Sequence, residues 1–236
     1  MRSKRTNSPV RSIRAAVTVV CAAVLGAVSG IGSVASAAPV GSSAPGGVLV
    51  SEQGPLDLWA VPTAPAESAT LIVAYSFGNR IPAGVDPART VGEPGPVNEA
   101  LAAAVVAARG DRAVPVYAQT EIAEVLKQRY GMTDVISIDP ERAADGTLVY
   151  LSTDGVAAQV ATLRGASVAT DAAAVVAFHD HQWRATKTTA KHGFRAFAPE
   201  GVAMPDQYDP QSGQTWTTSP LLYLPTDYLG RLALLR

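Results

Sequence analysis

Five short runs of apolar, largely β-branched residues constrain the fold of this chain more than any other feature. They are TLIVAYSF (70–77), VPVYAQ (114–119), DVISID (134–139), AAVVAFH (173–179) and FRAFAP (194–199). Each run is apolar at nearly every position, which is the pattern of a strand covered on both faces. We expect the runs at 70–77 and 173–179 to be central strands, because both are apolar on both faces.

Helical patterns separate these runs and also follow the last one. They are NEALAAAVVAARG (98–110), TEIAEVLKQRYG (120–131), STDGVAAQVATLRG (152–165), HQWRATKTTAKHG (181–193) and TDYLGRLALL (226–235). Thr120 and either Ser152 or Thr153 are plausible N-caps, and the first four patterns each end at a glycine, as helices often do. Because strands and helices alternate, the sequence predicts a three-layer α/β sandwich with a mainly parallel sheet of about five strands.

Residues 1–37 have the organisation of a secretory signal peptide. Residues 1–14 contain five basic and no acidic side chains, and an apolar run follows from Ala15 to Val28. Ala35 and Ala37 then form an A-x-A cleavage pattern. We therefore expect a mature chain that begins at Ala38 and lies outside the cytoplasm. The alternative is a retained anchor, since about 20 apolar residues can span a bilayer. The abundance of Ala, Gly and Ser in the run favours cleavage, after which no membrane span remains.

The remaining chain divides into a lead-in at 38–68 and a folded domain at 69–236. The lead-in is rich in Pro, Gly, Ser and Ala, which predicts a flexible segment with at most one edge strand. Without residues 1–37 the chain keeps 14 basic and 20 acidic side chains, a net charge of −6. This balance argues against nucleic acids and anionic membrane surfaces as partners, because both require clustered positive charge. The single cysteine, Cys21, lies in the signal, so neither disulfide nor thiol chemistry is expected in the mature chain.

The candidate site is the edge of the sheet where the strands end, since parallel sheets bind ligands there. Four segments leave this edge: 76–80, 118–121, 151–155 and 179–184. The last of them, HDHQWR, combines imidazoles that titrate near neutrality with an arginine that can hold a phosphate or carboxylate, beside a helix start. The sequence therefore predicts an anion pocket. We assign His181 and Arg184 as its central residues, with further ligand-binding positions at His179, Asp180, Ser152, Thr153, Asn79 and Arg80.

Several of these residues also have structural interpretations. Arg184 can pair with a carboxylate on a neighbouring loop, and Ser152 and Thr153 lie where side chains routinely cap helices. Trp183 is expected to pack in the helix rather than serve as a stacking platform. The polar segment at 204–218, with Asp209, Gln211, Ser212 and Trp216, is either a lid or ordinary surface.

The histidines divide into two groups. His192 directly precedes Gly193, where an imidazolium stabilises the negative end of a helix, so we expect it outside the site. His179, Asp180 and His181 form a weak metal signal, because no cysteine or further histidine accompanies them in this segment to complete a zinc sphere, and no metal site is predicted. The chain also lacks the G-x-S-x-G and G-x-G-x-x-G motifs. No cofactor is therefore identified.

The stretch AVVAFHDHQWRATKTTAKHGF (174–194) resembles the last βα unit of the SanA/ElyC/YdcF family of bacterial envelope-associated proteins. That family shows an apolar strand, a short turn and then His-x-x-Arg-Ala at the start of a helix. Here the pattern is His181, Arg184 and Ala185, and the helix ends at a glycine before the next strand. The resemblance extends to the order of elements from Thr70 to Arg236 and implies a Rossmann-like α/β fold.

Two other loops depart from the family pattern. A serine- and glycine-rich turn after the second strand is replaced by YAQTE, and a glutamate-led motif with Ser, Thr and Glu-Asn is replaced by YLSTDG. The resemblance therefore implies a functional role for His181 and Arg184 and gives weaker support for such a role at Ser152 and Thr153.

Together these features predict a secreted or envelope-associated YdcF-like domain. It would bind a small anionic ligand, with phosphorylated compounds as one candidate class, at the carboxyl edge of its sheet and would act in cell-envelope metabolism. If it turned the ligand over, His181 would act as acid or base and Arg184 as charge clamp. The alternative is a non-catalytic secreted interaction module in which the same fold survives and the pocket has decayed.

Overall fold

The computed structural model describes residues 59–235. The predicted signal peptide, its cleavage site and most of the lead-in lie outside the described residues. Among the residues that are described, no helix is both long and apolar enough to cross a bilayer.

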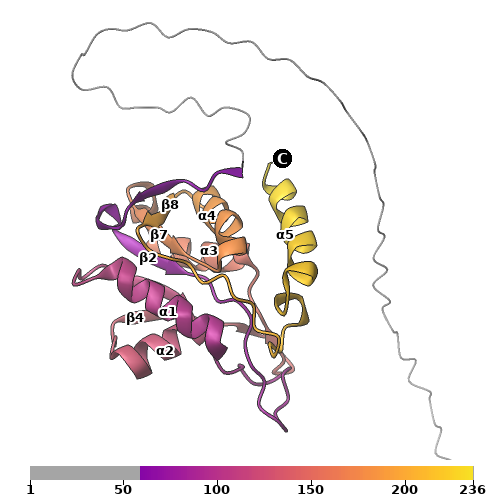
Figure 1. The fold of residues 1–236 in the computed structure, drawn as a ribbon. Coiled ribbons are helices and arrows are strands. Elements are labelled where there is room, and N and C mark those ends of the chain that lie inside the picture. Colours follow the sequence, from indigo (N-terminus) through magenta and orange to yellow (C-terminus); the bar gives the residue numbers. More distant parts are fainter. Residues whose placement is uncertain (1–58, 236) are drawn as a thin grey trace, which may run out of the picture. The chain divides into compact units, whose positions relative to one another are not determined.

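A six-stranded parallel sheet forms the centre of the domain (Figure 1). Its spatial order is β1-β8-β7-β2-β3-β4, and every neighbouring pair is parallel. The strands are β1 (Thr63–Pro65), β2 (Leu71–Ala74), β3 (Val116–Gln119), β4 (Val135–Ile138), β7 (Ala172–Val176) and β8 (Arg195–Glu200). The sixth strand, beyond the five expected, is β1, an edge strand contributed by the lead-in. A separate antiparallel pair consists of β5 (Glu141–Arg142) and β6 (Leu148–Val149).

Strands β2 and β7 occupy the middle of the sheet, as predicted, and every residue in both is buried. Alternate side chains enter opposite layers, because successive residues of a strand point to opposite faces. Ile72 and Ala74 pack in one apolar cluster, whereas Leu71 and Val73 pack in the other. Full burial of a valine such as Val73 stabilises the fold by roughly 1.5–3 kcal/mol. The continuous apolar runs are therefore explained by two covered faces.

Five α-helices flank the sheet and give the three-layer, Rossmann-like architecture (Figure 1). They are α1 (Gly95–Arg109), α2 (Thr120–Tyr130), α3 (Thr153–Arg164), α4 (Gln182–Lys191) and α5 (Pro220–Leu234). The cluster around Ile72 contains apolar residues of α1 and α2, and the cluster around Val73 contains those of α3 and α4. Helix α5 lies beside α4, where Figure 1 shows it in yellow.

The helix ends agree with the sequence in most places. Ser152 caps α3, because its side-chain oxygen accepts a hydrogen bond from the backbone N–H of Gly155 at 3.1 Å. The expected cap at Thr120 is wrong: Thr120 is the first residue of α2, and its hydroxyl donates to Asp139 Oδ1 at 2.7 Å instead. The four predicted terminal glycines, which have positive φ angles, follow or end the helices as expected: Gly110, Gly131, Gly165 and Gly193.

Helix α5 begins six residues earlier than the sequence pattern predicted. It starts at Pro220 rather than at Thr226 and contains Pro225 in its first two turns. Proline suits the first turn of a helix, where the missing N–H would have no intrahelical partner. Because prolines usually interrupt helical patterns, the sequence pattern did not predict this first part of the helix, which carries Tyr223.

Candidate functional site

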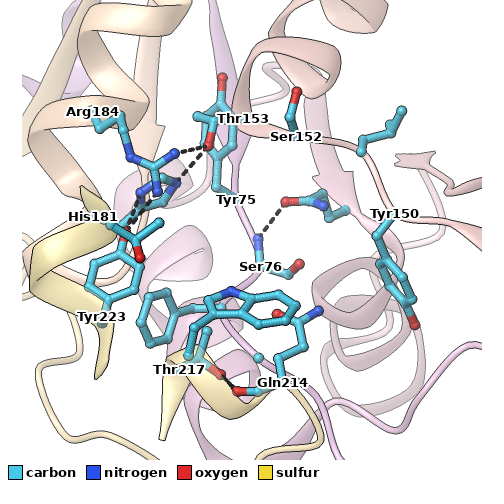
Figure 2. Close-up of a pocket in the computed structure, with 16 residues that line it drawn as sticks. Tyr75, Ser76, Tyr150, Ser152, Thr153, His181, Arg184, Gln214, Thr217 and Tyr223 are labelled. Carbon is cyan, nitrogen blue, oxygen red and sulfur yellow. Dashed lines mark hydrogen bonds between the residues drawn. The ribbon is translucent and has the colours of Figure 1, made fainter. Parts of the chain in front are cut away.

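A cavity of about 400 Å³, lined by both polar and apolar side chains, lies at the carboxyl edge of the sheet (Figure 2). All four segments predicted to meet there contribute to its wall. Ser76, Phe77 and Gly78 follow β2, Gln119 ends β3, residues 150–153 lead into α3, and His181 and Arg184 follow β7. The parallel arrangement of the strands explains the convergence, because their carboxyl ends share one edge.

The rest of the wall comes from the C-terminal part of the described chain. Gln214, Trp216 and Thr217 belong to the polar segment at 204–218, and Tyr223 and Thr226 belong to α5. This segment therefore forms part of the cavity wall, and Trp216 is one of its lining residues. Arg80, which does not line the cavity, holds the segment at 204–218 in place: its Nε and Nη2 donate to the two carboxylate oxygens of Asp209 at 2.8 and 3.1 Å.

The cavity wall carries positive charge and no negative charge. Of the sixteen described residues that line it, one is an arginine, Arg184, and none is an aspartate or glutamate. Ser152 and Thr153 place the start of α3 at the wall, and the N-terminus of a helix carries partial positive charge. Backbone N–H groups at such a helix start and an arginine together favour an anion.

Arg184 is held from three sides. Its Nε donates to Asp227 Oδ1 at 2.7 Å, its Nη1 to Thr153 Oγ1 at 2.9 Å and its Nη2 to the Tyr223 hydroxyl at 3.0 Å. The pairing with a carboxylate that the sequence left open is therefore present, although the carboxylate lies on α5 rather than on a loop. A guanidinium has five N–H bonds, so two remain without a partner among the described residues.

His181 lies between two hydroxyl groups. Its Nδ1 is 2.7 Å from the Tyr223 oxygen and its Nε2 is 3.4 Å from Thr153 Oγ1. Burial lowers the pKa of His181 to about 4, and this outweighs the opposing effect of Asp227. The imidazole is consequently neutral at pH 7. It can accept a proton or a hydrogen bond there, but it has no imidazolium proton to donate.

Asp227 anchors this group of side chains from the core. It is fully buried on α5 and accepts hydrogen bonds from Arg184, Arg231 and the Tyr223 hydroxyl. Burial alone would raise the pKa of Asp227, but its interactions with nearby His181 and with the guanidinium groups of Arg184 and Arg231 bring it well below the usual range. Asp227 is therefore an ionised carboxylate at neutral pH.

Tyr223 and Asp227 are the site residues that the sequence reasoning missed. One signal was present: Asp227 and Arg231 are the charged residues of an otherwise apolar helical pattern and are four positions apart, a spacing that pairs side chains on a helix. Their pairing with Arg184 and His181 depends on how α5 packs, which the local pattern does not contain.

His179 and Asp180 do not line the cavity. The exposed imidazole of His179 has Nδ1 3.1 Å from Asp180 Oδ1, and the other Asp180 oxygen accepts a hydrogen bond from the Tyr208 hydroxyl at 2.6 Å. The two residues lie with His181 in a 3₁₀ turn that follows the end of β7 at Val176, so His179 is not part of the strand as the run 173–179 predicted. Within the described residues no group of three or more His, Cys, Asp or Glu is placed to hold a metal ion.

Asn79 and Arg80 also lie outside the cavity. Asn79 is buried and donates from Nδ2 to the hydroxyl of Tyr150, a lining residue, at 3.0 Å. Arg80 is occupied by Asp209 and faces a different, acidic depression that Glu93, Glu99 and Glu124 line. Four of the predicted positions, His181, Arg184, Ser152 and Thr153, are thus brought together, and the other four are not.

His192 and Trp183 have structural contacts. His192 does not line the cavity, and its Nε2 lies 3.0 Å from Asp154 Oδ1 in the first turn of α3. Trp183 is buried and packs against Trp59 with ring centroids 5.4 Å apart, in agreement with its predicted packing role.

The described residues thus define a Rossmann-like α/β domain with a cavity at the carboxyl edge of its sheet, and the lining of this cavity includes Arg184. Comparison of the chain with protein-family models, with curated proteins and with solved structures finds no match. The resemblance to the SanA/ElyC/YdcF family accordingly stays a prediction from the sequence.

Proposed function

We propose that this domain binds a small anionic ligand, of the phosphate-ester class, at the end of the cavity formed by Thr153, His181 and Arg184. The observation that carries the proposal is the charge of the wall: one guanidinium with two uncommitted N–H bonds, the start of α3, and no carboxylate among the lining residues. A phosphate offers acceptor oxygens that match a guanidinium and helix N–H groups.

The size and composition of the cavity support a ligand larger than a bare anion. Its volume of about 400 Å³ lies within the range of small-molecule sites. Away from Arg184 the lining residues include Ser76, which Figure 2 labels, and Gln119; these carry a hydroxyl and an amide group. Such neutral groups suit the hydroxyl-bearing part of a phosphorylated compound.

Calorimetric titration of the full-length chain at fixed salt tests this proposal. The probes are inorganic phosphate and a panel of phosphorylated envelope precursors. Arg184→Leu should weaken binding about tenfold or more, because a hydrogen bond to a charged group contributes roughly 1.5–3 kcal/mol. His192→Gln, outside the cavity, is the matched control and should bind like the parent. Loss of binding in His192→Gln with retention in Arg184→Leu would refute the placement of the site.

We further propose that the domain acts outside the cytoplasm in cell-envelope metabolism, as a YdcF-like protein. The signal-like organisation of residues 1–37 and the His-x-x-Arg-Ala pattern at His181 support this. Cell fractionation followed by N-terminal sequencing should find a chain that starts at Ala38. An intact chain in the membrane fraction would instead identify residues 15–38 as an anchor.

A non-catalytic interaction module is the second candidate function. The observation that favours it is the outer face of α5, where Leu221, Leu229 and Leu232 are 83%, 70% and 50% exposed. Native mass spectrometry of the purified chain separates the two candidates. A retained phosphorylated species supports the ligand-binding function. An empty chain that binds a defined protein from culture supernatant, and loses it in Leu229→Glu, supports the module.

A further inference from the structure

Four side chains form a continuous series of hydrogen bonds from the cavity wall into the core. Thr153 Oγ1 lies 3.4 Å from His181 Nε2, His181 Nδ1 lies 2.7 Å from the Tyr223 oxygen, and that hydroxyl lies 3.1 Å from Asp227 Oδ1. The residues come from α3, the turn after β7, and α5. Figure 2 shows the cavity end of the series, with Thr153, His181 and Tyr223 drawn around Arg184.

The direction of each hydrogen bond follows from the chemistry of the buried end. An ionised Asp227 can only accept, so the single Tyr223 hydroxyl proton is donated to it. The Tyr223 oxygen must then accept from His181, which places the imidazole proton on Nδ1. A neutral imidazole carries one ring proton, so Nε2 keeps its lone pair. The hydroxyl of Thr153 is therefore the donor to Nε2.

The electrostatic surroundings favour negative charge on the Thr153 oxygen. Arg184 Nη1 donates to this oxygen at 2.9 Å, and Thr153 is the first residue of α3, at the positive end of the helix dipole. Both interactions strengthen as the hydroxyl loses its proton. The arrangement thus contains a hydroxyl, a base that accepts its proton, and groups that orient the base, which is the pattern of nucleophilic catalysis.

We propose that Thr153 is the nucleophile of a phosphate-ester hydrolase, with His181 as its general base and Tyr223 and Asp227 as positioning residues. This inference rests on the proposed function, because the two uncommitted N–H bonds of Arg184 would hold the phosphate of the ester.

The reaction proceeds in two balanced steps. Thr153 Oγ1 forms a bond to phosphorus while its proton passes to His181 Nε2. The bond between phosphorus and the ester oxygen breaks, the electron pair leaves with that oxygen, and His181 returns the proton to the departing alcohol. Water then attacks the phosphothreonine and gives a proton to His181. The Thr153 oxygen leaves phosphorus and recovers this proton, so that inorganic phosphate is released and no atom is oxidised or reduced.

The test uses the full-length chain and the chromogenic ester p-nitrophenyl phosphate. Thr153→Val should lower kcat by about 100-fold or more, the usual contribution of a proton-transferring pair, whereas Thr153→Ser should restore most of it. Thr162→Val, an exposed threonine on the same helix, is the matched control and should react like the parent. Acid quenching during turnover, followed by peptide mass spectrometry, should reveal phosphorylated Thr153.

Tyr223→Phe tests the positioning role. Phenylalanine fills the same space but neither accepts from His181 Nδ1 nor donates to Asp227. We expect kcat to fall about tenfold or more and KM for p-nitrophenyl phosphate to change less, because the lost hydroxyl contacts the base directly and the bound phosphate only through Arg184 Nη2, which donates to that hydroxyl at 3.0 Å. Equal changes in both parameters, or a variant with parental kcat, would contradict the positioning role.

Binding of inorganic phosphate separates failure of this inference from failure of the proposed function. A parent chain that binds phosphate but does not hydrolyse the ester, or a Thr153→Val variant that folds and turns over like the parent, overturns the nucleophile and leaves the binding function intact. A parent that neither binds phosphate nor turns over overturns both. Hydrolysis of p-nitrophenyl acetate through an acylated Thr153, without hydrolysis of the phosphate, overturns the assigned substrate class.

Discussion

The middle of the sheet and its carboxyl edge are both buried, but they are stabilised in different ways. In β2 and β7 every residue is buried, and their own side chains pack into two apolar clusters, one on each face. At the edge, Asp227, Tyr223 and His181 are buried too, yet each is hydrogen-bonded by a specific partner. Apolar burial is non-directional, whereas a buried charge requires correctly placed partners. The middle should therefore tolerate changes of shape, and the edge should not tolerate the loss of one partner.

The largest expected effect is the introduction of a charge into the middle. Val73→Asp or Val176→Asp would bury a carboxylate without a partner in a strand with no exposed surface, at a cost of several kcal/mol. Val149→Asp, at a 47% exposed valine, is the matched control and should change stability little. Chemical unfolding monitored by circular dichroism measures both. A Val73→Asp chain as stable as the parent would mean that β2 is not a central strand.

The second-largest loss of stability is expected when the buried charge at the edge of the sheet is removed. Asp227→Asn would leave Arg184 and Arg231 without their carboxylate, which costs about 3–5 kcal/mol for a buried pair. Asp134→Asn provides the contrast, because Asp134 pairs with Arg109 while it is 59% exposed, and surface pairs contribute about 1 kcal/mol or less. Unfolding free energies of the two variants give the comparison directly. Similar losses in both would show that the edge is not a specific network.

Acid should weaken the edge through His181. Because burial lowers the pKa of His181 to about 4 from an ordinary 6.5, the unfolded chain takes up a proton before the folded chain does. This contribution to stability is complete above pH 6.5, falls as the pH drops from 6.5 to about 4, and amounts to about 3 kcal/mol. Asp227, Arg184 and Arg231 face the imidazole. Asp227, whose pKa is also lowered, adds a loss in the same direction at still lower pH.

The pH dependence of His181→Gln isolates this effect from the other titrating groups. Subtraction of its stability curve from that of the parent should leave a slope between pH 6.5 and 4 and none above. A flat difference would mean that His181 titrates alike in the folded and unfolded chain.

The smallest effect is expected at His192. Its contact with Asp154 is at the surface, where Asp154 is 54% exposed, so His192→Gln should change the unfolding free energy by less than about 1 kcal/mol. The melting temperature should stay close to that of the parent. A loss as large as that of Asp227→Asn would place His192 in the same network as His181.

The same contrast explains how much the sequence could predict. The strands at 70–77 and 173–179 were identified because burial on both faces leaves a local signature, and the four loops followed from the parallel arrangement. Because capping is local as well, the cap of α3 was narrowed to Ser152 or Thr153, and the structure shows Ser152. These features depend on residues close together in the chain.

The partners of Arg184 and His181 left no local signature. Asp227 is 43 positions from Arg184 and Tyr223 is 42 positions from His181, so their contacts depend on the packing of α5. His179 and Asp180 were assigned by proximity in sequence, but the 3₁₀ turn directs them away from the cavity wall. Arg80 was assigned as part of the segment at 76–80 that leaves the sheet edge, but its guanidinium pairs with Asp209. Whether these residues belong to the site therefore depends on contacts between residues that are far apart in the sequence.

The position of α5 in the chain also sets the order in which the cavity can form during synthesis. All six strands of the sheet, including β8 (Arg195–Glu200), leave the ribosome before Asp227 on α5. Until α5 docks, His181 and Arg184 have no carboxylate to orient them. The nascent chain would therefore pass through a late stage of its translation, between the synthesis of β8 and that of α5, in which every strand of the sheet is present but the binding site is unformed. Competence for the ligand would arise as one of the last folding events.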